Sequence, residues 1–174
     1  MQYHTIMVGQ KIDGIEVSNA VKDILKNAVK KLNSENVVPC LATVLVGDDP
    51  ASATYVKNKH NACEKIGIKT KDHRLPIDTT QNELDKIIDE LNNNKEVHGI
   101  LVQLPLPKQL DEFKTITRIS PIKDVDGLTP QNVGLLAMGK SIFKPCTPSG
   151  IMEMFYYYKI DLEGKNIVMI NRSN

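Results

Sequence analysis

A chain of 174 residues with 41% hydrophobic and 25% charged residues is long enough for one well-packed core but too short for two full domains. Its formal net charge of +1 excludes a general electrostatic footprint for nucleic acid or an anionic membrane, so we expect small molecules or proteins as partners. No apolar run approaches the about 20 residues of a membrane span, and Met1–Gly9 lacks the apolar core of a signal peptide.

The cysteines indicate a reducing compartment. Cys40, Cys63 and Cys146 are odd in number and widely spaced, and they form no CxxC pair and no cluster with histidine. This pattern argues against a disulfide framework and against a structural zinc site. We therefore expect a cytoplasmic protein that binds no metal.

The first part of the chain predicts a helix, a strand and a second helix in turn. Apolar residues recur at close to a helical period over Gly14–Leu32, which predicts an amphipathic helix. Pro39–Val46 is a short apolar run rich in branched residues, which is typical of a strand. Asp49 then fits the N-cap of a helix with Pro50 at its first position, and Gly67 marks where that helix stops.

The same alternation continues along the chain. We expect a weaker strand over Lys69–Leu75, a helix over Thr79–Asn93 and a buried strand over Val97–Leu104, with helical patterns again over Leu110–Ile119 and Pro130–Met138. The repeated order of strand and helix predicts the α/β class, as a three-layer domain in which a mostly parallel sheet has helices on both faces.

A glutamine stands at the end of the buried strand. The sequence VHGILVQLPLP is an apolar run that two prolines terminate, and Gln103 lies where the run ends. The carboxyl ends of the strands face the ligand crevice in open α/β sheets, which favours contact between Gln103 and a substrate. The alternative is an amide that only satisfies loop backbone.

The helix after Asp49 places an aromatic ring and an amine on one face. Tyr55 and Lys59 are four residues apart, so their side chains project from the same side, near the strand end that leads into the helix. Taken alone, Lys59 is more simply interpreted as a solvated lysine.

Two turns carry further polar groups. Lys123–Gly127 reads KDVDG, and its two carboxylates fit a solvated loop, a metal site or a site for an amino-pyrimidine ring. Metal is the weaker interpretation, because no histidine or further acidic ligand is near. Pro145–Gly150 reads PCTPSG and leads into an apolar helix. Its hydroxyl groups either contact a ligand or cap that helix, and capping is the default expectation.

In this order and at these separations, the segments YVKNK, ILVQLPLP, KDVDG and PCTPSG resemble those of the bifunctional methylenetetrahydrofolate dehydrogenase/methenyltetrahydrofolate cyclohydrolase family. Each motif is weak alone, but four in register make an accidental match improbable. The resemblance covers essentially the whole chain. It implies interconversion of one-carbon tetrahydrofolates in support of purine biosynthesis, with NADP as cofactor and a homodimer in the full-length form.

The resemblance also implies roles for individual residues. Lys59 would be the catalytic lysine, Gln103 its partner, Asp126 the carboxylate that binds the pterin end of folate, and Tyr55 the aromatic that packs on the ligand. Water adds to a cationic methenyl bridge in the cyclohydrolase step, and repulsion from that cation would favour the neutral amine of Lys59 as general base. Gln103 would orient the amine without adding charge. In the dehydrogenase step the protein would mainly orient the nicotinamide that takes the hydride.

The match fails at the phosphate-binding loop of the family. Asn171 stands at the first glycine of that loop, and Arg172 and Ser173 match positions near the 2′-phosphate of NADP. The resemblance thus implies a folate-binding catalytic domain over residues 1–158 and the start of a truncated Rossmann domain over residues 159–174, with a strand at Asn166–Ile170. We expect this chain not to bind NADP, because a dinucleotide site needs more of the fold.

Two consequences follow from that departure. In the family the last helix packs on the first domain, so we expect apolar surface to be exposed here. The alternative to an enzyme domain is a non-catalytic remnant that binds folate or pairs with a full-length homologue.

Overall fold

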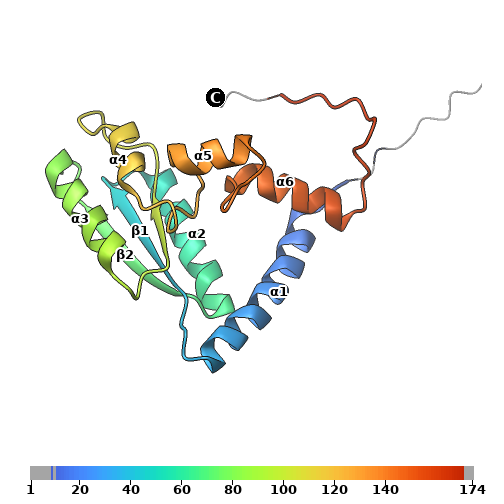
Figure 1. Cartoon of the computed structure of the whole chain (residues 1–174), viewed down its shortest axis with the longest axis horizontal. Coiled ribbons are helices and arrows are strands. Elements are labelled where there is room, and N and C mark those ends of the chain that lie inside the picture. Colours follow the sequence, from blue (N-terminus) through green and yellow to red (C-terminus); the bar gives the residue numbers. More distant parts are fainter. Residues whose placement is uncertain (1–8, 10, 171–174) are drawn as a thin grey trace, which may run out of the picture.

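The computed structural model describes residues 9 and 11–170 of the chain. Helices and strands alternate through most of this length (Figure 1). In chain order they are α1 (Gly14–Ser34), β1 (Cys40–Val46), α2 (Pro50–Ile66), β2 (Lys69–Leu75), α3 (Gln81–Asn93), β3 (Gly99–Val102), α4 (Glu112–Arg118), α5 (Pro130–Ala137) and α6 (Cys146–Tyr157).

The three strands form one parallel sheet in the order β2-β1-β3, with α2 on one face and α3 on the other (Figure 1). Successive residues of β1 point to opposite faces. Val44 belongs to the apolar core with Leu84 and Ile88 of α3, whereas Thr43 contacts His60 of α2. The predicted α/β class, with helices on both faces of a parallel sheet, is confirmed.

The caps of α2 follow the predicted chemistry, and α3 begins later than expected. Asp49 accepts a hydrogen bond from the Ser52 backbone N–H at 2.7 Å, and Gly67 ends α2 in the left-handed region at φ 87°. The N-cap of α3 is Thr80, because Glu83 completes a capping box with it.

The last part of the chain packs differently from the sheet. No residue of α6 is buried, and Val168 and Ile170 are 87% and 97% exposed. The strand predicted over Asn166–Ile170 is wrong, since this segment pairs with no strand in the described residues. Extended backbone without a neighbour leaves its hydrogen-bonding groups to water.

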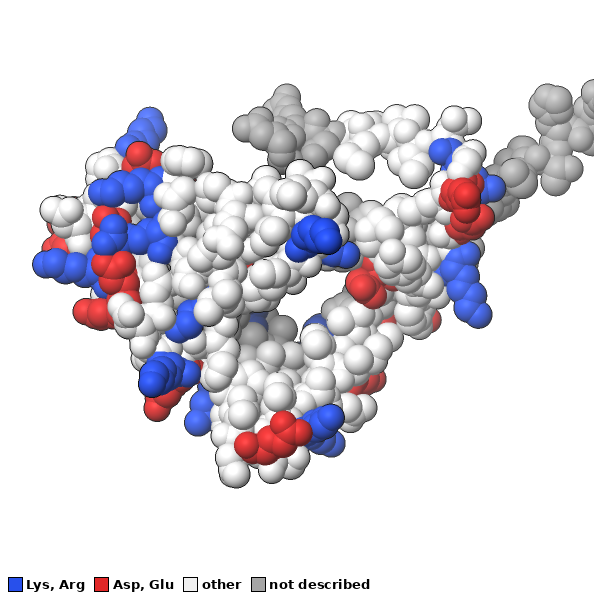
Figure 2. Space-filling model, viewed as in Figure 1, with Lys and Arg blue, Asp and Glu red and all other residues white. Residues whose placement is uncertain are grey.

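Apolar surface is also exposed around α1, as expected. Ile24 and Leu25 are exposed, and an apolar groove of about 350 Å³ runs between α1, α2 and α6. The space-filling view has a hollow between these helices (Figure 2). None of the helices in residues 9 and 11–170 is long and apolar enough to cross a membrane.

Candidate active site

Lys59 and Gln103 meet at the carboxyl end of the sheet. Lys59 lies half-buried on α2, and its Nζ donates to Gln103 Oε1 at 3.4 Å. Gln103 Nε2 donates to the Leu104 carbonyl at 2.7 Å, which directs the oxygen of the amide toward the lysine. The amide nitrogen thus satisfies loop backbone, as the alternative interpretation of Gln103 held, and the amide oxygen contacts Lys59; contact between Gln103 and a substrate stays a prediction.

Backbone pairing fixes the place of Gln103. The strand β3 is shorter than predicted, but the Gln103 N–H still donates to the Val44 carbonyl of β1 at 2.9 Å. The side chain is thus held at the point where the strand ends. The chain then turns away through a cis Leu104–Pro105 peptide.

The partner of Lys59 is neutral. Within the described part of the chain, Lys59 forms no salt bridge, and its hydrogen bond is to an amide oxygen. An amide oxygen holds the amine in place by a hydrogen bond, without an ion pair.

The two carboxylates of the 123–127 turn have different surroundings. Asp124 is 2% exposed and accepts hydrogen bonds from the Thr129 N–H and from Asn132 Nδ2, both at 2.8 Å. Burial alone would raise the pKa of Asp124, but these hydrogen bonds outweigh it and lower the pKa overall. Asp124 ties the turn to α5, whereas Asp126 is half-buried and lies next to Cys146.

The same turn is attached to β3. The Ile100 N–H donates to the Lys123 carbonyl at 2.7 Å, and Ile100 and Asp124 form a parallel bridge beside the sheet. A Cβ at position 99 would clash with Val125, so Gly99 allows this close approach. The turn is therefore a continuation of the sheet edge and not a free loop.

Cys146 contacts the predicted site residue Asp126, a contact that the sequence did not predict. Its Sγ donates to Asp126 Oδ1 at 3.5 Å and to the Val125 carbonyl at 3.6 Å. Partial burial, followed by the charge of Asp126, raises the pKa of the thiol and keeps it a protonated donor. A contact across 20 residues has no local signal in the sequence.

The expected capping role of the 145–150 hydroxyls is wrong. Pro145 is the N-cap residue of α6, and no side chain caps this helix. Proline at that place brings no oxygen acceptor, so the first backbone N–H groups of α6 lack a side-chain partner.

The remaining predicted residues lie apart or outside the described residues. Tyr55 shares the α2 face with Lys59 and is 63% exposed, so its ring is accessible to a ligand. Asn171, Arg172 and Ser173 lie outside the described residues. In the described residues no group of three or more His, Cys, Asp or Glu side chains could hold a metal ion.

Comparisons with known proteins agree on one family. Residues 12–126 match the family model described as tetrahydrofolate dehydrogenase/cyclohydrolase, catalytic domain. Bifunctional protein FolD of Nitrosopumilus maritimus is 67% identical over 168 residues, which are 97% of this chain and 58% of that relative. The FolD protein of Cenarchaeum symbiosum is 60% identical, over 93% of this chain and 57% of its own length. The chain thus spans less than two thirds of these curated relatives.

Solved structures resemble the fold closely. FolD of Campylobacter jejuni matches with a TM-score of 0.87 and 48% identity, over 88% of this chain and 55% of that one. The Trypanosoma brucei methylenetetrahydrofolate dehydrogenase-cyclohydrolase, solved with NADP and an inhibitor, matches with a TM-score of 0.86 and 34% identity, over 90% of this chain and 54% of its own.

Proposed function

This chain belongs to the tetrahydrofolate dehydrogenase/cyclohydrolase family, and from that membership we propose that it forms the folate-binding domain of such an enzyme and hydrolyses 5,10-methenyltetrahydrofolate to 10-formyltetrahydrofolate. The observation that carries the proposal is the 3.4 Å hydrogen bond from Lys59 Nζ to Gln103 Oε1 at the carboxyl end of the sheet. Parallel sheets bind ligands at that end.

Hydrolysis needs a base near the methenyl carbon. A water molecule attacks this carbon, which lies between two nitrogens and carries positive charge, and a C–O bond forms. The amine of Lys59 accepts one proton from the water and later returns it to N5 as the bond from the carbon to N5 breaks, while the second proton of the water leaves to solvent and the formyl C=O bond forms. Gln103 holds the amine during both transfers through its oxygen.

Asp126 and Tyr55 bind the ligand in this proposal, and Cys146 supports Asp126. The Asp126 carboxylate accepts hydrogen bonds from the ring amide and exocyclic amine of the pterin, and the thiol of Cys146 donates to Asp126 Oδ1. Donors on a ligand that stay unpaired on burial cost about 1–3 kcal/mol each, so this match favours folates over other ring systems. Tyr55 packs its exposed ring against the ligand.

The oxidation of 5,10-methylenetetrahydrofolate belongs to the same proposal for the whole protein. NADP supplies the hydride acceptor in that step. The described residues form no cradle for it, because Asn166–Ile170 lies exposed and unpaired. No residue among those described is therefore assigned to the cofactor, and Asn171, Arg172 and Ser173 stay predictions. We place the domain boundary after Tyr158, where α6 has ended.

The remaining attributes are proposed on family membership. They are a cytoplasmic location, a homodimer in the full-length form and the supply of one-carbon units for purine biosynthesis. A non-catalytic remnant that binds folate or pairs with a full-length homologue is the second candidate, favoured by the absence of buried residues from α6.

One assay separates the two candidates. The purified chain is given 5,10-methenyltetrahydrofolate, and the loss of its absorbance is followed with the wild type, Lys59→Ala and Lys57→Ala. Lys57 lies exposed on the same helix and serves as the matched control. Hydrolysis above the solvent rate that is lost only in Lys59→Ala supports the enzyme, whereas folate binding without turnover supports the remnant.

A further inference from the structure

A second polar contact joins α2 to the sheet one residue after Lys59. His60 Nε2 lies 2.8 Å from Thr43 Oγ1 in β1, and Thr43 is fully buried at 0% exposure. In the described residues, this contact and the Lys59–Gln103 bond are the two side-chain hydrogen bonds that connect α2 with the strands or with the end of β3. The proposed mechanism gives His60 no part.

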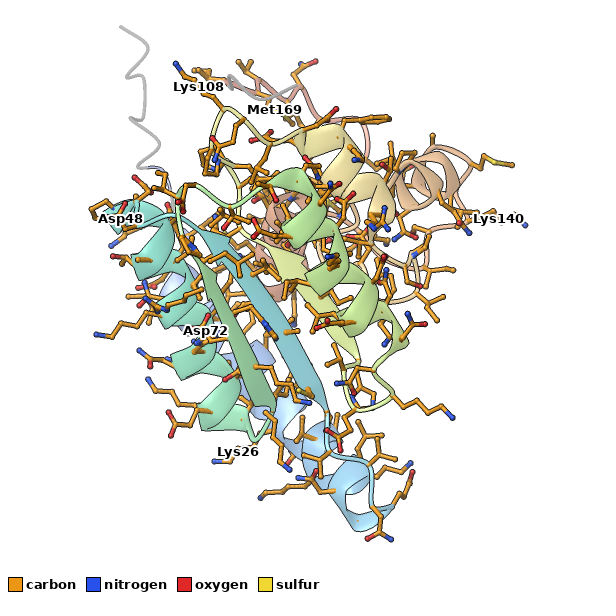
Figure 3. All side chains as sticks on the ribbon, turned by 90° about the vertical axis from the view of Figure 1, so that its left-hand side faces the viewer. Lys26, Asp48, Asp72, Lys108, Lys140 and Met169 are labelled. Atoms are coloured by element: carbon orange, nitrogen blue, oxygen red, sulfur yellow. The ribbon has the colours of Figure 1, made fainter. Side chains whose placement is uncertain are left out.

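The direction of this contact follows from its third member. Thr43 Oγ1 donates to Asp72 Oδ1 of β2 at 3.2 Å, and Asp72 stands on the side of β2 that faces α2 (Figure 3). Burial raises the pKa of Asp72, but hydrogen bonds from Arg74 and Thr43 outweigh it and lower the pKa overall, so the carboxylate only accepts. Since the hydroxyl has one proton, Thr43 must accept from a protonated His60 Nε2.

The two contacts close a ring through the sheet. Lys59 Nζ donates to Gln103 Oε1, and the Gln103 N–H donates to the Val44 carbonyl at 2.9 Å. Val44 follows Thr43, which accepts from His60, and His60 follows Lys59. Consecutive helix residues point about 100° apart, so a helix held at both positions cannot rotate about its axis without breaking one bond.

We infer that His60 is a positioning residue: its hydrogen bond to Thr43 sets the rotation of α2 and thereby aims the Lys59 amine at Gln103 and the methenyl carbon. The inference rests on the proposed hydrolytic function. At 3.4 Å the Lys59–Gln103 bond is near the upper limit for a hydrogen bond, so a small rotation of α2 removes it. Misplacement of a reacting group by about 1 Å can cost about 100-fold in rate.

The test removes and restores the donor at position 60. His60→Leu keeps a similar volume without a donor, and His60→Gln returns an N–H group near the position of Nε2. Asn61→Leu, an exposed change on the same helix, is the matched control. For each variant we measure kcat and KM for methenyltetrahydrofolate, thermal unfolding, and the side-chain amide signals of Gln103 in a ¹H–¹⁵N NMR spectrum, assigned by their loss in Gln103→Leu.

We expect His60→Leu to lower kcat by about tenfold with little change in KM and to shift the Gln103 amide signals. In His60→Gln, we expect kcat and the Gln103 amide signals to return most of the way to their wild-type values. If His60→Leu unfolds, Thr43→Val removes the same bond from the β1 side and answers the question. An unshifted Gln103 amide in a folded His60→Leu variant overturns the inference, as does a Gln variant that behaves like the Leu variant.

The amide signals also separate the two proposals. A wild-type chain that hydrolyses nothing, but whose Gln103 amide moves in His60→Leu and returns in His60→Gln, contradicts the proposed function and leaves the positioning role supported.

Discussion

Different interactions stabilise the sheet body (residues 40–127) and the α5–α6 region (residues 128–170). The sheet body has a continuous apolar core, from Ala42 in β1 to Ile119 after α4. In the α5–α6 region the buried residues among those described are Thr129 and Asn132, and both donate to Asp124. Few charged side chains lie over α5 on the face seen in Figure 2.

Further hydrogen bonds attach the α5–α6 region to α1, beside the apolar groove between α1, α2 and α6. Tyr157 and Tyr158 donate to the Glu16 carboxylate of α1 at 2.8 and 2.9 Å. Hydrogen bonds of this kind contribute about 0.5–1.5 kcal/mol net each, far less than a shared apolar core. Lys59 and Gln103 therefore stand on the part with the continuous apolar core, whereas Cys146 meets Asp126 from the loosely attached α5–α6 region.

The largest effect expected is on turnover and not on folding. Lys59→Ala should abolish cyclohydrolase activity, a loss of about 10²–10⁴-fold for a general base, because the amine is the group that takes the proton. The fold should persist, since Lys59 is only half-buried and its loss opens no core cavity. Stopped-flow hydrolysis measures the loss of turnover, and thermal unfolding measures whether the fold persists. Near-normal turnover of Lys59→Ala would remove Lys59 from the mechanism.

A core substitution in each region sharpens the comparison. Leu84→Ala in α3, at 0% exposure, should lower the free energy of unfolding by about 3 kcal/mol through lost burial and a cavity. Ile151→Ala in α6, at 44% exposure, should cost less than about 1 kcal/mol. Urea titration followed by circular dichroism measures both. Similar losses would mean that the α5–α6 region has a core of its own.

Asp124 and Asp126 should separate stability from binding. Asp124→Ala leaves the Thr129 N–H and one N–H of Asn132 Nδ2 without an acceptor in a buried place, at a cost of about 2–6 kcal/mol when each buried donor costs about 1–3, while the second N–H of Nδ2 keeps the Pro121 carbonyl. Asp126→Ala should keep stability and weaken the binding of a folate analogue. Unfolding curves and titration calorimetry on the two variants test this, and equal losses of binding at equal stability would contradict the assignment.

Much of the fold and part of the candidate site can be predicted from the sequence, and the signal is different for different residues. The elements up to Ile119 follow from hydrophobic period and capping, and Gln103 falls at a strand end because the prolines stop the run. The resemblance of four motifs points to Lys59 and Asp126. The sequence does not reveal the contact of Cys146 with Asp126 or the different burial of Asp124, because both depend on segments that meet only in the folded chain.

Acid should loosen the junction between the two regions. The pKa of Asp124 is lowered in the folded chain, so its contribution to stability is fully present above the unfolded value of about 3.9 and is lost as the pH falls through the lower, folded value. We expect the urea midpoint to be flat from about pH 7 to 5 and to fall below about pH 4. Asp124→Asn should reduce this dependence. A urea midpoint that rises as the pH falls would contradict the predicted direction of this pH dependence.

The last prediction is that NADP does not bind when the 174-residue chain is titrated with it. Arginine suits the 2′-phosphate, because its planar fork pairs with phosphate oxygens, and Arg172 and Ser173 match family positions near that group. A dinucleotide site also needs a helix N-terminus aimed at the pyrophosphate and a second mononucleotide half for the nicotinamide.

The segment that leads to those two residues gives them no support in the described structure. Asn166–Ile170 pairs with no described strand, and its apolar side chains are exposed, as 79% for Met169 illustrates. Ordering side chains on such a segment costs about 0.5–1.5 kcal/mol each, with little buried surface to offset it. Calorimetry should therefore give only heats of dilution. Saturable micromolar binding would mean that the α5–α6 region, although loosely attached to the sheet body, assembles a nucleotide site, for example between two copies of the chain.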